Sequence, residues 1–441
     1  MACDSRNWWN LSRRGAAPAA RFPLAGLLIA LALAGCTGGS TTAPPTGGVG
    51  PVKSPSTSGG SQGPTTGGRA TAVTWQTGDL SLPTPFPIEQ LVPIGDRLFL
   101  IASDNGSAAG PTAKPSGGIW STADGLAWTK QSDIDAIKSS GTDRPTLMAA
   151  APNGRGGAVV VGSKRTADGA ESTAAWWTAD GKTWANASVE GPAGAMYSVV
   201  GRPDGLVAVG ITFAGVNAVP AAWRSTDGGS SWTSVSLPGG GREARDVTVW
   251  GDKFVAIGRA ADANLFLWAS ADGATWSVVE SPSDASFSPS QLIPFGNALV
   301  VLGNGVSGSA ILTCGNDMTC TRASVPSLGY MASSTQIRAG AEVSGTIVVN
   351  ALSGTAGTVA SPVADPVAGT VASPGPSADA VPGLDFFAST DGRTWTTLKS
   401  SPALVVVTSN LVAFDGRLVG VALTGPDVTA ATVKVVVGDL R

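Results

Sequence analysis

"WTADGKTW", residues 177–184, reads as one hairpin: an apolar approach, an Asp-Gly step and a returning Trp. An Asp-Gly step between two β-prone runs favours a tight turn, because Gly tolerates positive φ and Asp can bond nearby backbone amides. The Trp begins the returning strand and can fold back over the turn. Its burial is worth at most about 4–6 kcal/mol at ~25 cal/mol/Å². We therefore expect a hairpin fastened by its own Trp.

The same phrase occurs five times, and we call these segments the box hairpins. They are "STADGLAW" (121–128), "WTADGKTW" (177–184), "STDGGSSW" (225–232), "SADGATW" (270–276) and "STDGRTW" (389–395). They resemble the Asp box, or BNR repeat, S-x-D-x-G-x-S/T-W, of sialidases, sortilin-type receptors and other propellers. Residues 225–232 match its spacing in full, whereas the others are shorter or looser at the Gly.

The resemblance implies that the box hairpins lie on the periphery of a propeller, away from its central channel. It therefore implies a structural role for their Asp and Trp residues. These residues are Asp124, Trp128, Asp180, Trp184, Asp227, Trp232, Asp272, Trp276, Asp391 and Trp395.

Each box hairpin ends a longer unit of four short apolar runs. In one unit, "YSVVG" and "DGLVAVGI" precede "AAWRST" and its box hairpin. A four-stranded unit that recurs every 45–55 residues or so is typical of a β-propeller. A pair of β-sandwiches, the alternative all-β architecture, gives no reason to repeat one turn five times.

The two ends of the repeat region complete each other. Trp75 in "VTWQTGDL" resembles a final strand without its three predecessors, and "ATVKVVVGD" (431–439) resembles a third strand without its fourth. We expect these ends to share one blade, which leaves no exposed sheet edge. The sequence thus predicts an all-β, seven-bladed β-propeller of four-stranded blades over residues 71–441, with six or eight blades as the alternatives.

Two segments depart from the repeat. Cys314 and Cys320 lie in "ILTCGNDMTC" (311–320), with Cys320 where the Trp is expected. A disulfide is the natural interpretation outside the cytoplasm, because a metal site needs more ligands.

The second departure, about residues 354–383, contains "AGTVASP" twice and is rich in Ala, Pro, Gly and Ser. This composition predicts a disordered insertion in one blade, most simply a tolerated surface loop.

The N-terminus predicts export and a lipid anchor. Basic residues precede an eleven-residue apolar run, Leu24–Ala34, which is too short for a membrane span. The run continues into "LAGC", which resembles the bacterial lipobox, so residues 1–35 are a predicted lipoprotein signal peptide and Cys36 its lipidation site. "SRRGAA" is a weak twin-arginine signal.

Residues 36–70 are nearly all Gly, Ser, Thr and Pro, as in a disordered tether. Such a tether resembles those of actinobacteria, and we expect the protein on the outer face of the cytoplasmic membrane.

The composition excludes several classes of binding and catalytic site. Net charge is −3, without a basic run, whereas nucleic-acid binding depends on Lys and Arg that neutralise phosphates. The chain contains no His, the commonest metal ligand and neutral-pH acid/base, so a Ser-His-Asp triad is impossible. Phosphate loops and paired-Cys metal motifs do not occur. We expect no cofactor, no metal and no nucleic-acid partner.

The sialidase resemblance does not extend to catalytic residues. Sialidases use a Tyr nucleophile polarised by a Glu. By family resemblance, we would also expect three Arg for the substrate carboxylate, an Asp acid/base and an Arg-Ile-Pro motif. Only Tyr197 and Tyr330 occur here, no Arg-Ile-Pro stretch is found, and no Glu stands in an obvious pairing. We assign no catalytic residue.

Our interpretation is a cell-envelope lipoprotein whose propeller binds another envelope protein or a glycan. The alternatives are an extracytoplasmic Asp-box glycoside hydrolase (exo-sialidase-like) or lyase, and a structural wall-associated spacer. Propellers bind ligands with loops at the mouth of the central channel, near the start of each innermost strand. Aligned units place these polar residues there: Gln90, Arg144, Tyr197, Arg245, Asp246, Gln291, Arg338 and Asn410.

Overall fold

The fold is known from a computed structural model. It describes residues 70–82, 88–103, 117–133, 137, 144–165, 169–215, 217–260, 265–279, 287–305, 308–325, 336–353, 383–401, 406–424 and 432–441. The chain divides into Met1–Gln62 and Gly63–Arg441, and every described residue belongs to the second unit. The predicted signal peptide, Cys36, the tether up to residue 69 and the insertion over 354–382 lie outside the described residues. No helix among the described residues is long and apolar enough to cross a membrane.

The described part of the chain is built of β-strands joined by tight turns. Sheet 1 contains β2 (Ile88–Ile94), β3 (Arg97–Ser103), β4 (Gly117–Thr122) and β5 (Thr129–Asp133). Sheet 2 contains β6 (Arg144–Pro152), β7 (Ala158–Arg165), β8 (Glu171–Thr178) and β9 (Trp184–Asn186). Sheet 3 contains β11 (Gly194–Arg202), β12 (Gly205–Ala214), β13 (Asn217–Ser225) and β14 (Ser231–Ser236), with β10 (Ser188–Glu190) added parallel to β14.

The remaining strands form two four-stranded sheets and one of eight strands. Sheet 4 contains β15 (Glu243–Trp250), β16 (Lys253–Arg259), β17 (Leu265–Ser270) and β18 (Ser277–Val279). Sheet 5 contains β19 (Phe287–Phe295), β20 (Ala298–Gly305), β21 (Gly308–Cys314) and β22 (Cys320–Arg322). Sheet 6 joins β23 (Gln336–Val343), β24 (Thr346–Ser353), β25 (Gly383–Ser389) and β26 (Thr396–Ser401) to β1 (Ala72–Leu82), β29 (Thr432–Leu440), β28 (Arg417–Thr424) and β27 (Val406–Phe414).

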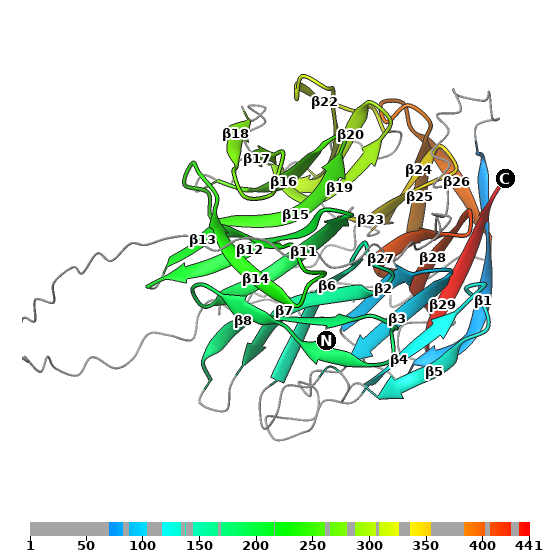
Figure 1. The fold of residues 1–441 in the computed structure, drawn as a ribbon. Coiled ribbons are helices and arrows are strands. Elements are labelled where there is room, and N and C mark those ends of the chain that lie inside the picture. The colour runs from blue at the N-terminus through cyan, green and yellow to red at the C-terminus, as the bar shows by residue number, and fades with distance from the viewer. Residues whose placement is uncertain are drawn as a thin grey trace, which may run out of the picture. The chain divides into compact units, whose positions relative to one another are not determined.

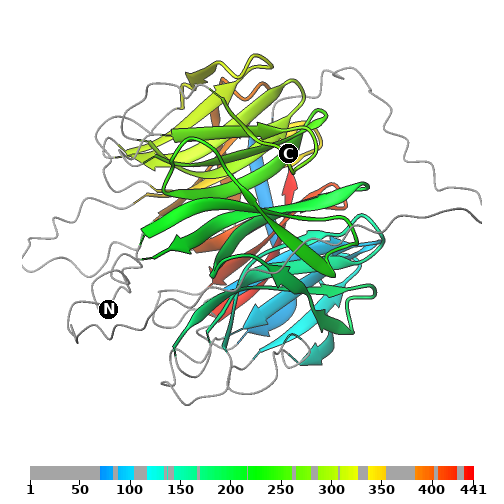
Figure 2. The same cartoon turned by 60° about the vertical axis from the view of Figure 1, so that its left-hand side comes forward.

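The sheets contact one another through their first strands, which we call the inner strands: β2, β6, β11, β15, β19, β23 and β27. Each inner strand contacts the next along the chain, and β27 contacts β2. Figures 1 and 2 show the sheets following one another around a common centre. Successive four-stranded antiparallel units packed in this way make a β-propeller, as the sequence predicts.

The core lies between neighbouring sheets. In β7, six consecutive residues from Ala158 are buried, because sheets 1 and 3 cover both faces of sheet 2. This explains why the inner part of each unit is a continuous apolar run instead of an alternating one. One cluster joins Trp176 to Phe99 across sheets 1 and 2, and another joins Val159 to Trp223 across sheets 2 and 3.

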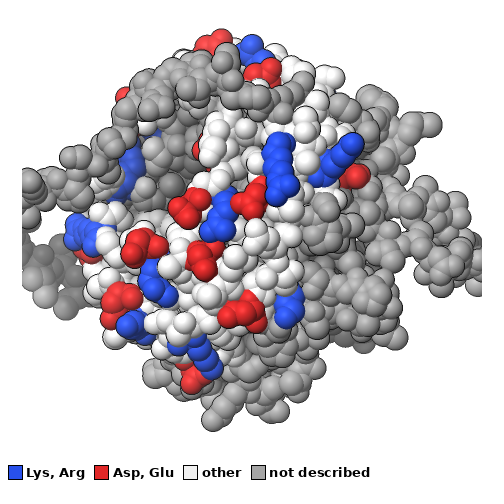
Figure 3. Space-filling model, turned by 90° about the vertical axis from the view of Figure 1, so that its right-hand side faces the viewer, with Lys and Arg blue, Asp and Glu red and all other residues white. Residues whose placement is uncertain are grey.

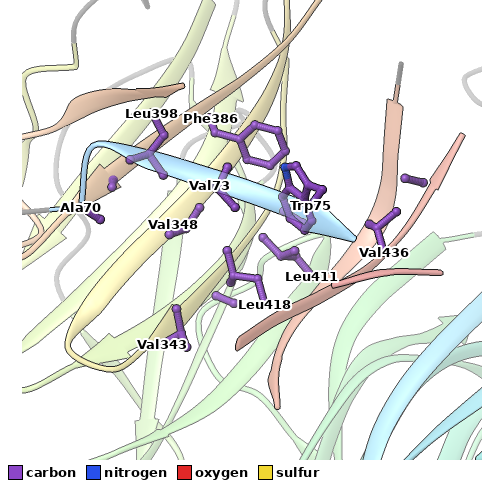
Figure 4. Packing of buried hydrophobic residues seen from close by; sticks show 14 residues of the cluster. Ala70, Val73, Trp75, Val343, Val348, Phe386, Leu398, Leu411, Leu418 and Val436 are labelled. Atoms are coloured by element: carbon purple, nitrogen blue, oxygen red, sulfur yellow. The ribbon is translucent and has the colours of Figure 1, made fainter. Parts of the chain in front are cut away.

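The two ends of the repeat region share sheet 6. Strand β1 pairs antiparallel with β29, with Trp75 opposite Gly438, and the two strands lie side by side in Figure 1. The predicted pairing of Trp75 with residues 431–439 is therefore present. Strand β1 also pairs parallel with β26, from Ala72 opposite Lys399, which the sequence did not predict. Figure 4 shows Trp75 beside Phe386, with ring centroids 5.2 Å apart, in the cluster that joins both halves of the sheet.

Each box hairpin is held by its own Asp and Trp. In the hairpin at 177–184, the Asp180 carboxylate accepts hydrogen bonds from the backbone N–H groups of Lys182 and Thr183, both at 2.8 Å. The indole N–H of Trp184 donates to the Gly181 carbonyl at 3.2 Å, and all five hairpins have this bond, at 2.9–3.2 Å. These contacts satisfy the polar groups of a tight turn whose Gly has positive φ.

The box hairpins also join neighbouring sheets. A Cβ at Gly181, Gly229 or Gly273 would lie 2.1–2.4 Å from a side chain of the preceding sheet, namely Phe99, Val159 or Val207. Arginines of the preceding sheet donate to carbonyls of the hairpin, such as Arg155 to Thr226 at 2.7 Å. Only Gly allows this approach, so the box hairpin is a joint between sheets as well as a turn.

The predicted disulfide between Cys314 and Cys320 is present and replaces the Trp in sheet 5. Cys314 is fully buried, and the two residues pair across β21 and β22. On the chain-entropy model a loop this short contributes about 2.4 kcal/mol.

We expect Cys314→Ser/Cys320→Ser to lower the free energy of unfolding by about this amount, measured by denaturant titration. A reductant should lower the free energy of unfolding of the wild type and leave that of the double variant unchanged. An equal change in both proteins would show that the disulfide does not stabilise the fold.

Candidate functional site

Six of the seven inner strands carry an irregularity of register at similar positions, whereas β2 pairs with β3 without one. The register shifts near Met148 in β6, Tyr197 in β11, Arg245 in β15, Ser290 in β19 and Arg338 in β23, and across residues 408–410 in β27. These irregularities lie in the first half of their strands or at the middle. We call the end of the sheets where the inner strands begin the mouth end. A bulge adds a residue to one strand and redirects side chains, which is common beside functional sites.

The eight predicted mouth residues are all on inner strands. Tyr197, Arg245 and Arg338 are the bulge residues themselves, Asp246 and Gln291 follow bulges, and Asn410 lies in the irregular part of β27. Gln90 lies on β2 and Arg144 begins β6. The side chains of Arg144, Arg338 and Asn410 lie outside the described residues, as does Tyr330.

Two of these residues, Gln90 and Gln291, hold neighbouring sheets together. The Gln291 amide donates to the Gly340 carbonyl at 2.8 Å and accepts from its N–H at 2.9 Å. The Gln90 amide donates to the Met148 carbonyl at 2.9 Å. Their polar groups are thereby used in contacts between sheets.

Asp246 links three consecutive sheets. Its carboxylate accepts a hydrogen bond from the Ser198 hydroxyl at 2.5 Å and from the Leu292 N–H at 2.6 Å. Burial raises the pKa of Asp246, although these hydrogen bonds lower it in part. The Asp246 carboxylate is therefore a clamp between three neighbouring inner strands, β11, β15 and β19.

This clamp predicts a pH dependence. Because the folded pKa lies above the unfolded value, the stabilisation from Asp246 is present below the unfolded pKa and is lost as pH rises through the folded pKa. Asp246→Asn removes this titration. We expect the difference in Tm between the Asp246→Asn variant and the wild type to shift in favour of the variant as pH rises above the unfolded pKa of about 4. The exposed Asp96→Asn is the control; a Tm difference for Asp246→Asn that stays constant with pH would contradict the clamp.

Tyr197 and Arg245 form the open part of the mouth, together with two residues that the sequence analysis missed. The Arg245 guanidinium lies 5.8 Å from the centre of the Tyr197 ring. Its Nε lies 2.9 Å from a carboxylate oxygen of Glu243, and the Arg259 Nη1 lies 3.7 Å from the same oxygen. Glu243 lies only two residues before Arg245 on the same strand, and this closeness of opposite charges in the sequence could have indicated the pair.

The environment of Tyr197 does not favour a nucleophile. Burial raises its pKa to about 12; Arg245 lowers it in part, whereas Glu243 and Glu171 raise it further. A Tyr nucleophile is instead activated by a base or a lowered pKa. Within the described residues, no three acidic or Cys side chains gather closely enough to hold a metal ion.

Comparison with known proteins finds solved structures only. No protein-family model matches the chain, and no curated protein does. One similar structure is a catalytically inactive virginiamycin B lyase from Staphylococcus aureus with quinupristin (TM-score 0.47, 12% identity, 82% of this chain and 99% of that chain covered). Another is YCF48 from Cyanidioschyzon merolae (0.45, 12%, 82% and 98%). A third is the Trypanosoma rangeli sialidase with 2,3-difluorosialic acid (0.39, 12%, 82% and 56%).

The chain thus spans 56% of the length of that sialidase. These neighbours include enzymes as well as a protein solved with a peptide, as YCF48 has also been seen bound to D1 peptide (0.46, 13%, 83% and 97%). At such low identity the likeness says nothing of a ligand or an activity, because one fold carries many functions.

Proposed function

We propose that this protein is an exported lipoprotein, anchored through Cys36 to the outer face of the bacterial cytoplasmic membrane. Its seven-bladed β-propeller binds an envelope protein or a glycan at the mouth of the central channel. The lipobox-like "LAGC" and the Gly/Ser/Thr/Pro-rich residues 36–70 support the anchor and tether.

Two observations support a count of seven blades. The seven inner strands contact one another in chain order, with β27 returning to β2. The pairing of β1 with β29 makes β27, β28, β29 and β1 a four-stranded unit like the others. In this count β23–β26 form the sixth blade and the two ends of the repeat region complete the seventh.

The observation that carries the binding function is the repeated bulge. Irregular pairing at corresponding positions of neighbouring inner strands costs ladder hydrogen bonds and brings no stability to a propeller. It occurs at Tyr197 and Arg245, two neighbouring residues of the mouth end whose side chains are in contact. A rigid scaffold that presents adaptable side chains at one end is suited to recognition. A Tyr-dependent glycosidase is less well supported, since the pKa of Tyr197 is raised.

Affinity capture from membranes tests the binding function. The full chain, purified in detergent, is compared with Tyr197→Ala/Arg245→Ala and with Lys182→Ala, which changes an exposed box hairpin. We expect one stoichiometric partner, or one glycan, to be retained by the wild type and Lys182→Ala and lost by the mouth variant. Turnover of a glycan by the pure protein, abolished in the mouth variant, would contradict a binding role.

Metabolic labelling with palmitate tests the anchor separately. We expect the wild type to be labelled and to sediment with membranes, and Cys36→Ala to be unlabelled. Label that persists on Cys36→Ala would contradict the proposed lipidation site.

A further inference from the structure

The mouth ends of sheets 3 and 4 hold more hydrogen-bond donors than acceptors. Glu243 is the carboxylate that Arg245 and Arg259 share, and its side chain is only 18% exposed. Arg245 uses its Nε on Glu243, and its two terminal nitrogens make no hydrogen bond within the described residues. The Arg259 Nε is buried and has no hydrogen-bond partner there. One carboxylate therefore leaves both guanidinium groups only partly satisfied.

Two further charged residues, Arg242 and Glu171, lie near this pair of arginines. Arg242 is exposed, and its backbone N–H bonds the Arg259 carbonyl at 2.7 Å, which places it next to Arg259. The Glu171 carboxylate nearby accepts a hydrogen bond from Ser163 at 2.8 Å. Two guanidinium groups, those of Arg245 and Arg259, thus share the Glu243 carboxylate. On the side of the molecule shown in Figure 3, Lys and Arg are instead interspersed with Asp and Glu.

The exposure of the two arginines allows them to contact a ligand. The side chains of Arg245 and Arg259 are 44% and 34% exposed, whereas Glu243 lies deeper. Their stems are held by the β15 bulge and by the cross-strand pairing of Glu243 with Arg259. A carboxylate that approaches from the mouth meets fixed guanidinium donors, which bind such groups in bidentate fashion.

We propose that Arg245 and Arg259, which share Glu243, form a docking site for an acidic segment of a protein partner. This inference rests on the proposed binding function and names the chemistry of the partner. Carboxylates of the segment supply the acceptors that these arginines lack, and Glu243 is the internal carboxylate with which they compete.

A protein segment fits this site better than a sugar. Glycan sites commonly offer an open aromatic face, but Tyr197 is half-buried and Arg245 lies over its ring. Arg and Tyr are, by contrast, the residue types most enriched at the centres of protein interfaces. The site therefore recognises charge and hydrogen-bond geometry in place of ring stacking.

The test measures binding of a labelled poly-glutamate peptide to the full chain by fluorescence anisotropy at low ionic strength. We expect Arg245→Gln/Arg259→Gln to weaken binding by about tenfold or more. Lys182→Gln, which removes one positive charge from a box hairpin, should bind like the wild type. Glu243→Gln should bind more tightly, because it removes the internal competitor; a purely structural ion pair would give no gain.

Equal peptide binding by the wild type and the double variant overturns the inference, provided that both have the same circular dichroism spectrum. Tighter binding of hyaluronan than of poly-glutamate, with the same dependence on Arg245 and Arg259, overturns the choice of a protein partner. Capture of a membrane partner that survives Arg245→Gln/Arg259→Gln but not Tyr197→Ala/Arg245→Ala would leave the proposed function standing and refute this docking site.

Discussion

Trp232→Ala should lower the free energy of unfolding by about 3–5 kcal/mol, among the largest single losses in this protein. The Trp232 side chain is only 1% exposed and packs in the cluster that joins sheets 2 and 3. Its indole N–H donates to the Gly229 carbonyl at 3.0 Å, so truncation leaves a cavity and a buried carbonyl without its donor. Denaturant titration followed by circular dichroism measures the loss.

Trp232→Phe separates the two contributions. Phe retains much of the apolar volume but has no indole N–H, and we expect a loss of roughly 1–2 kcal/mol. A Trp232→Ala variant as stable as the wild type would show that the box hairpin is not fastened by its Trp. Equal losses for Ala and Phe would assign the whole effect to the hydrogen bond.

Gly229→Ala should lower the free energy of unfolding by roughly 2–4 kcal/mol. Gly229 has φ of 95°, and a Cβ there would lie 2.1 Å from Cγ1 of Val159 in the preceding sheet. The variant therefore combines left-handed backbone strain with a clash between sheets. Thermal and denaturant unfolding both measure this loss.

Gly251→Ala is the matched control. Gly251 also has positive φ, 62°, but a Cβ added there would meet no atom within 4 Å. We expect a loss of about 1 kcal/mol from backbone strain alone. Similar losses at both glycines would mean that the box hairpin does not act as a joint between sheets.

The sequence predicts the features that depend on neighbouring residues. The Asp-Gly turns followed by Trp predicted the hairpins, and the apolar runs before these turns predicted the four-stranded units. The two incomplete units, around Trp75 and over residues 431–439, predicted that the ends of the repeat region pair, and β1 does pair with β29. The expected export of the chain predicted the disulfide between Cys314 and Cys320, and the pairing of β21 with β22 brings the two residues together.

Features that depend on contacts between sheets were not predicted. The Gln291 amide bonds Gly340, and Arg155 bonds Thr226, across sheets whose relative position no local pattern specifies. The bulge at Arg245 adds one residue without changing the apolar pattern. The parallel pairing of β1 with β26 depends on how two neighbouring units meet.

The same distinction applies to the candidate site. Alignment of the units found the inner strands and so Tyr197, Arg245 and Asp246. It did not distinguish Asp246, whose carboxylate is engaged by Ser198 and Leu292, from Arg245, whose terminal nitrogens are available. Only the contacts between sheets separate a residue that holds the mouth together from one that can meet a ligand.

The central claim is that the two ends of the repeat region close the propeller by pairing in one sheet. Thr74 of β1 lies opposite Asp439 of β29. Lys434 of β29 lies opposite Ser81 of β1, which is well separated from Thr74 along that strand. The direct test is oxidation of the variant Thr74→Cys/Asp439→Cys, with Thr74→Cys/Lys434→Cys as control, followed by mass spectrometry of the cross-linked peptides. The account predicts an intramolecular bond between positions 74 and 439 in the first variant and none in the control. A first variant that stays uncross-linked, or forms only bonds between molecules, would contradict it.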